Sequence, residues 1–289
     1  MTLRQGIFAL MALCLKLTFK HALAAILLML SFASPVAAGP GEDAAAAYAR
    51  GDYATALRLL RPLAEQGDAQ AQYNLGVLYD NGQGVPQDNA EAMKWYRKAA
   101  DQGDARGQNN LANMYATGQG VPKNYVEAMK WFRRAADQGN ARAQHSLGFM
   151  YATGQGVPQD YAEAVTWLRK AADQGNAPSQ YSLGLFYRQG TGVPQDNAEA
   201  VKWYRKAADQ GYADAQYNLG FMYKEGLGVP QDYVQAHMWF SLAATTGDRG
   251  AAEGRDIVAS LMTPPQIAEA QKLAREWKPK PERPYSSPF

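Results

Sequence analysis

One motif recurs along most of this chain at a fixed spacing of 36 residues. Residues 79–103 read YDNGQGVPQDNAEAMKWYRKAADQG, and residues 115–139 read YATGQGVPKNYVEAMKWFRRAADQG. The same period separates five tryptophans, which are Trp95, Trp131, Trp167, Trp203 and Trp239. A fixed period of about 20–50 residues is typical of a repeat protein, in which each unit packs only on its neighbours.

Each unit is predicted to be two helices joined by an extended turn. In the first unit, Leu75 and Leu78 recur at helical spacing, and Gly82 stands where a helix needs a left-handed residue after its end. The letters QGVP then form the turn, since the residue before a proline avoids helical angles. Asp88 and Glu91 predict a capping box at the start of the second helix. The fold class is therefore all-α, a solenoid of 36-residue helix–turn–helix repeats.

The period also sets the predicted boundaries of the domains. Five full units occupy residues 67–247, over 67–102, 103–138, 139–174, 175–210 and 211–246. Residues 39–66 form a shortened unit without the long turn, which we expect to cap the N-terminal end. Residues 248–277 hold two more helical segments, the second opened by a capping box of Thr263 and Gln266, and we expect them to cap the other end. Residues 278–289 are Pro-rich and predicted to be disordered.

The first 38 residues have the pattern of a secretory signal peptide. Arg4, Lys16 and Lys20 precede the apolar run ALAAILLMLSF, and small residues follow up to Ala38. The run is shorter than the roughly 20 apolar residues that span a bilayer. An uncleaved membrane anchor is the alternative, and translation from Met11 instead of Met1 is also open. We expect a periplasmic or secreted protein with no stable membrane span.

Removal of this segment changes the formal net charge from +2 to −1, because three basic residues and no acidic ones leave. A near-neutral chain lacks the basic face that nucleic-acid binding requires, so we predict no nucleic-acid partner. Cys14, the only cysteine, leaves as well, so the mature chain has no disulfide. Its stability must come from packing, and the tryptophan series is interpreted as core that fills the space between layers.

Comparison of the units separates constant from variable positions. On the second helix, outward residues such as Glu91, Lys94, Arg97 and Lys98 recur almost unchanged, which predicts a solvated, charge-paired face. On the first helix, one arc is constant, with Gln72, Leu75 and Gly76 among its members, and Gly76 is expected to let a neighbouring helix approach closely. The opposite arc varies.

We predict that the variable arc lines a concave groove that binds a protein or peptide. Its Tyr and Phe side chains would be apolar anchors, its Asn side chains would bond a partner's backbone, and Arg106, Arg142 and Arg188 would bind carboxylates. The alternative is that the arc varies only because nothing constrains it. The predicted partner-binding residues are Tyr73, Asn74, Val77, Arg106, Asn109, Asn110, Asn113, Arg142, His145, Phe149, Tyr181, Leu185, Arg188, Tyr217, Asn218, Phe221 and Lys224.

The chain carries no recognisable catalytic motif. The mature chain has two histidines, His145 and His237, which we expect to lie apart from any Ser or Asp partner. The Gly-rich GQGVPQD lacks the lysine of a phosphate-binding loop and recurs as a turn. We predict no catalytic residues, no metal site and no cofactor.

The pattern A-x-x-x-L-G-x-x-Y-x-x-G-x-G-V-P-x-D-x-x-x-A-x-x-W-x-x-K-A-A-x-x-G resembles the Sel-one-like repeat (SLR), a relative of the tetratricopeptide repeat. Residues 67–247 match it in five consecutive units, of which the last drifts to WFSLAATTG. The resemblance implies a right-handed α-solenoid that binds protein or peptide partners, often as a periplasmic or secreted adaptor. The alternative is an enzyme of the β-lactamase type, linked to a cysteine-rich branch of the same family whose cysteine pairs this chain lacks. A nitrocefin assay separates the two.

The signal-like segment generates a first prediction. The mature protein should begin at or near Gly39 and accumulate outside the cytoplasm, because the small residues up to Ala38 suit a signal peptidase. N-terminal sequencing of the bulk protein checks this, and a sequence that starts at Met1 would reject cleavage.

Overall fold

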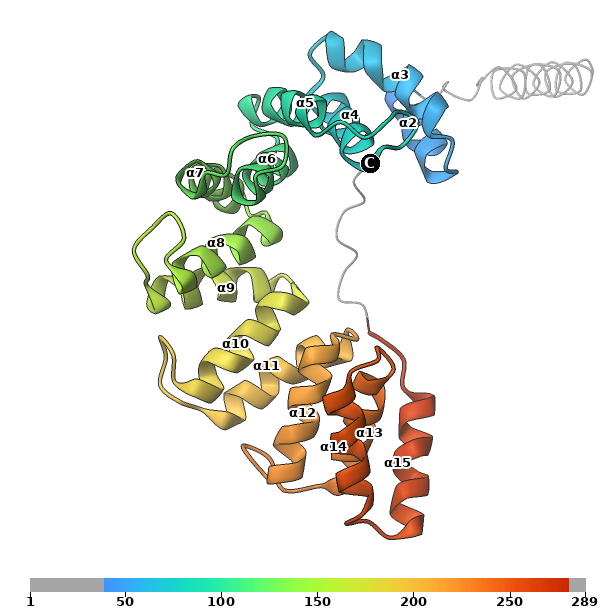
Figure 1. Ribbon diagram of the computed structural model, residues 1–289, viewed down its shortest axis with the longest axis vertical. Coiled ribbons are helices and arrows are strands. Elements are labelled where there is room, and N and C mark those ends of the chain that lie inside the picture. Colours follow the sequence, from blue (N-terminus) through green and yellow to red (C-terminus); the bar gives the residue numbers. More distant parts are fainter. Residues whose placement is uncertain (1–38, 281–289) are drawn as a thin grey trace, which may run out of the picture.

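The computed structural model describes residues 39–280, which fold into fourteen α-helices in consecutive pairs (Figure 1). The predicted signal segment and most of the predicted tail, residues 1–38 and 281–289, lie outside the described residues. Consecutive helices from α2 to α14 pack on one another, and α15 packs on α13. The pairs follow an open arc, with α6 on its inner side and α7 on its outer side (Figure 1). The predicted all-α solenoid is confirmed.

The first helices of the pairs are α2 (Pro40–Ala49), α4 (Ala69–Asn81), α6 (Ala105–Thr117), α8 (Ala141–Thr153), α10 (Ala177–Gln189), α12 (Ala213–Glu225) and α14 (Arg249–Ala259). The second helices are α3 (Tyr53–Glu65), α5 (Asn89–Asp101), α7 (Tyr125–Asp137), α9 (Tyr161–Asp173), α11 (Asn197–Asp209), α13 (Tyr233–Ala244) and α15 (Pro264–Glu276). Helices α2 and α3 form the shortened pair, and α14 and α15 are the two helices that follow the last full repeat.

Each second helix from α5 to α13 begins at an Asp or Asn that caps it. Asp88 Oδ1 accepts hydrogen bonds from the backbone N–H groups of Ala90 and Glu91, at 2.9 and 3.0 Å. The other half of the predicted capping box is wrong: the backbone N–H of Asp88 donates to the carbonyl of Tyr79 at 3.0 Å, and Glu91 pairs with Lys94. At α15, by contrast, the backbone N–H of Thr263 does donate to Gln266 Oε1, at 2.8 Å.

The long turn of each repeat rests on the preceding second helix. Gly84 has a φ of +73°, and a Cβ there would lie 2.8 Å from the backbone of Tyr53, the first residue of α3. In the next repeat, a Cβ at Gly120 would lie 2.6 Å from the carbonyl oxygen of Asn89, the first residue of α5. Both the backbone angle and the close contact therefore require glycine. The turn, predicted only as a connection, also joins one repeat to the previous one.

Apolar side chains fill the space between the helices, as predicted. Trp131, Trp167, Trp203 and Trp239 are buried, and Trp95 is half-buried. The close approach expected at Gly76 is confirmed, since a Cβ there would lie 2.6 Å from the ring of Tyr96 on α5. The approaching helix is the second helix of the same repeat.

A buried glutamine links each repeat to the next. Gln144 on α8 is 5% exposed, and its Nε2 donates to the carbonyl of Ala136 on α7 at 3.0 Å. Its Oε1 accepts from Nε2 of Gln174, which follows α9, at 2.7 Å. The same two bonds recur at Gln72, Gln108 and Gln180. This glutamine ladder joins the ends of successive second helices through the first helix between them.

The ladder stops where the sequence drifts. Gln216 donates to the carbonyl of Ala208 at 3.2 Å, but the position that would hold its second partner is Thr246. The hydroxyl of Thr246 donates instead to the carbonyl of Ala243 at 2.9 Å. The stack then closes with α14 and α15, where Trp277 packs edge-on against Trp239, with ring centroids 6.4 Å apart.

Candidate interaction surface

Side chains of the variable arc reach from one first helix to the next. Arg106 Nη2 on α6 donates to Gln70 Oε1 on α4 at 2.9 Å, and Arg188 Nη1 on α10 donates to Asn218 Oδ1 on α12 at 2.9 Å. Neighbouring first helices therefore lie side by side along this face. We call it the first-helix surface, defined by the seventeen predicted residues.

The structure divides these residues by exposure. Those buried in the chain are Tyr73, Asn74, Val77, Asn109 and Asn218. Those half-buried are Arg106, Asn110, His145, Tyr181, Leu185, Arg188, Tyr217, Phe221 and Lys224. Those exposed are Asn113, Arg142 and Phe149, all on α6 and α8 in the middle of the stack. The exposed residues of the first-helix surface therefore lie on α6 and α8.

Arg106 and Arg188 have partners within the chain. Arg106 pairs with Asp104 at 2.6 Å, and its guanidinium lies 4.4 Å from the ring centroid of Tyr73. The guanidinium of Arg188 lies 5.0 Å from the ring centroid of Phe221. Binding of a partner's carboxylate by these two side chains, as predicted, would therefore compete with contacts that hold neighbouring repeats together.

Aromatic residues of the arc stack on the second helix of their own repeat. The ring of Tyr73 lies 5.9 Å from that of Tyr96, and the ring of Tyr181 lies 6.0 Å from that of Tyr204. Burial raises the pKa of Tyr204 to about 12, so its hydroxyl stays protonated. The repeats of α6 and α8 carry Asn109 and His145 at this register, and so lack the aromatic pair.

The second-helix face is only partly the solvated face that was predicted. Lys94, Lys130 and Lys202 are exposed and pair with the glutamate three residues earlier. Arg97, however, donates to the hydroxyl of Tyr115 on the next first helix, and its guanidinium lies 5.1 Å from the ring centroid of Trp131. Its recurrence reflects packing between repeats as well as charge.

The prediction that both histidines lie apart from any serine is wrong. His145 Nδ1 on α8 lies 2.9 Å from Ser179 Oγ on α10, and His237 Nδ1 lies 3.3 Å from Ser241 Oγ. Ser179 Oγ donates its only proton to Asn176 Oδ1 at 2.8 Å, so it must accept from His145. The imidazole therefore cannot serve as a base toward Ser179, which is fully buried. The pair is a contact between repeats.

Within residues 39–280, no three His, Cys, Asp or Glu side chains gather as a metal ion would require. None of the helices in that range is long and apolar enough to cross a membrane.

The fold and this surface define a helical-repeat solenoid of the kind that presents a face built from many short units. A family model described as the Sel1 repeat matches the chain six times, over residues 45–68, 69–104, 105–140, 141–176, 177–212 and 213–248. The chain belongs to the Sel1 repeat family, whose members bind proteins. The first match overlaps the shortened unit predicted at residues 39–66.

The first of three similar solved structures supports this assignment. A Sel1 repeat protein from Oxalobacter formigenes is 36% identical, with a TM-score of 0.72 over 82% of this chain and 96% of that one. A protective antigen of uropathogenic Escherichia coli with an SLR fold is 27% identical over 80% of each chain, with a TM-score of 0.35. Immunity protein Pa5087 of Pseudomonas aeruginosa is 22% identical over 74% of this chain and 84% of that one, with a TM-score of 0.49. Only the first carries weight here. No curated protein sequence matches the chain.

The half-buried position of His145 generates a second prediction. Burial lowers the pKa of this imidazole, so below about pH 6.5 the unfolded chain binds a proton that the folded chain does not. This contribution to stability is present above about pH 6.5 and is lost as the pH falls toward the lowered pKa. When the pH is lowered from about 7.5 to about 5.5, the urea concentration at the midpoint of unfolding should therefore drop less in His145→Asn than in the wild type. Equal drops in the two proteins would contradict the assignment.

Proposed function

We propose that this chain is a non-catalytic scaffold or adaptor that binds a protein or peptide partner on the first-helix surface. The site lies on α6 and α8, in the middle of the arc. The family supplies the general role, since Sel1 repeat proteins bind proteins. The particular site is argued from the exposed side chains.

The exposed ring of Phe149 carries the proposal. Phe149 is 51% exposed, whereas Val77, at the same register on α4, is 8% exposed. Phe221, at the same register on α12, lies under the guanidinium of Arg188 from the preceding first helix. The preceding first helix of Phe149 is α6, which carries Ala116 at the register of Arg188. No long side chain at that register covers the ring, so it remains available as an apolar anchor.

Polar residues on the same two helices suit a peptide. Asn113, on α6 at the register of Phe149, is exposed, and its amide can both donate to and accept from a backbone. Arg142, exposed near the start of α8, adds a positive charge. An aromatic anchor among polar groups is the composition typical of a binding hot spot.

We further propose that the protein acts in the bacterial envelope or the secreted space. The support is the signal-like pattern of residues 1–38. The non-catalytic part of the proposal is supported by the Ser179 hydroxyl, which is buried and donates to Asn176. The proposed binding function needs no cofactor.

The third prediction tests the site. Asn113→Ala combined with Phe149→Ala should reduce capture of the native partner by about ten-fold or more, because the pair removes the anchor and a neighbouring hydrogen-bonding group. Both side chains are exposed, so the melting temperature should stay nearly unchanged. Crosslinking in the native host, followed by quantitative mass spectrometry of the captured protein, gives the measurement.

Val126→Ala is the matched control. Val126 on α7 is 55% exposed, so its substitution by alanine removes an exposed apolar side chain from a second helix. Capture should be unaffected. Loss of the partner in Val126→Ala, with capture retained in the double variant, would place the site on the second helices instead.

A further inference from the structure

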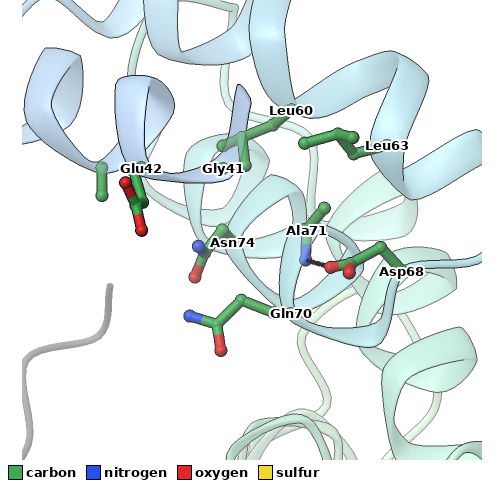
Figure 2. A pocket seen from close by; sticks show the side chains of 9 residues that line it. Gly41, Glu42, Leu60, Leu63, Asp68, Gln70, Ala71 and Asn74 are labelled. Atoms are coloured by element: carbon green, nitrogen blue, oxygen red, sulfur yellow. Dashed lines mark hydrogen bonds between the residues drawn. The ribbon is translucent and has the colours of Figure 1, made fainter. Parts of the chain in front are cut away.

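A cavity of about 390 Å³ lies at the N-terminal end of the solenoid, between α2, α3 and α4. Leu60 and Leu63 on α3 give it an apolar wall. The side chains of Glu42, Asn74 and Gln70 project into the same space (Figure 2). Asp68 also lines the cavity, so two carboxylates and no basic side chain are among its lining residues.

Asn74 is the unusual member of this lining. It is 3% exposed, and its Oδ1 has no hydrogen-bond partner among the described residues. A buried carbonyl oxygen without a donor destabilises the folded chain. The Asn74 amide turns about a broad, roughly two-fold torsion, so Oδ1 can rotate toward the cavity when a donor arrives there.

The last full repeat shows what a donor at this register looks like. Asn218 stands at the register of Asn74, and its Oδ1 accepts from the guanidinium of Arg188 on the preceding first helix at 2.9 Å. The first helix that precedes Asn74 is α2, where Ala49 stands at the register of Arg188. The shortened unit therefore lacks a guanidinium of the kind that donates to Asn218 Oδ1 in the last full repeat.

We propose that this cavity binds a single arginine side chain of the partner. The guanidinium would donate to Asn74 Oδ1, as Arg188 does to Asn218, and Glu42 and Asp68 would balance its charge. The aliphatic stem would lie against Leu60 and Leu63. This inference rests on the proposed protein-binding function and adds a second, charged contact at the N-terminal end of the same face.

The probe for the test is N-acetyl-arginine amide, titrated into the purified protein while the side-chain amide signals are followed by NMR. We expect saturable shifts of the Asn74 amide. Asn74→Ala should weaken binding by about ten-fold, the usual effect of removing one hydrogen bond to a charged group. Glu42→Gln should weaken it by about two- to five-fold, as expected for an exposed ion pair. Glu42 is exposed, so its variant keeps the test valid even if Asn74→Ala unfolds the cap.

Asn218→Ala is the matched control, because its asparagine already has an arginine, and it should leave probe binding unchanged. N-acetyl-norleucine amide tests the charge. Equal binding of that probe, or no change in Glu42→Gln, would overturn the proposal and leave only an apolar hollow. A variant without residues 281–289, which include Arg283, tests the other occupant. If that deletion tightens probe binding, the chain's own tail fills the cavity and the assignment to a partner is wrong.

The outcome of this experiment is independent of the outcome of the test of the proposed function. Probe binding depends only on the cavity, whereas capture by the Asn113 and Phe149 variant depends on the middle of the face. Retained capture in that variant together with specific probe binding would keep the cavity and reject the site on α6 and α8.

Discussion

The glutamine ladder is the interaction on which the rest of the solenoid depends. A buried primary amide is most stable when its donors and acceptor have partners, since each buried polar group without a partner costs about 1–3 kcal/mol. Gln144 meets this condition only while α7, α8 and the end of α9 keep their relative positions. The same requirement recurs at each rung, so the ladder fixes how one repeat sits on the next as well as how strongly it packs.

Because the ladder and the Gly84-type contacts fix the stack, the opposite arc of each first helix is free to vary. Part of this variation still holds the stack together: Arg188 bonds Asn218 and covers Phe221. On α6 and α2 the residue at the register of Arg188 is alanine, at Ala116 and Ala49. The first of these leaves Phe149 exposed, and the second leaves Asn74 without a donor. Alanine in place of arginine at this one register thus accounts for both proposed contacts, at Phe149 and at Asn74.

The sequence was sufficient to predict the elements that depend on local chemistry and period. The helix pairs, the left-handed Gly82, the buried tryptophans and the close approach at Gly76 all follow from spacing and residue type. Contacts between repeats were harder, because a constant position does not reveal its partner. Gln72 was recognised as constant but not as a link, and His145 was not matched with Ser179, which lies 34 residues away. The capping box was half wrong because Tyr79, from the other side of the turn, takes the Asp88 N–H. The cavity was not predicted from the sequence, because it depends on how the shortened unit packs on the next repeat.

The most direct measurement of this account is hydrogen exchange, repeat by repeat, in Gln144→Leu. The change leaves the carbonyl of Ala136 and the amide of Gln174 without their shared partner. If the ladder joins neighbours only, protection should fall by about 1–3 kcal/mol in α7, α8 and α9 and change little at either end of the stack. Gln119→Leu, at an exposed glutamine in the turn between α6 and α7, should leave protection as it is. A uniform loss across all helices, or no loss in α7 to α9, would contradict the account.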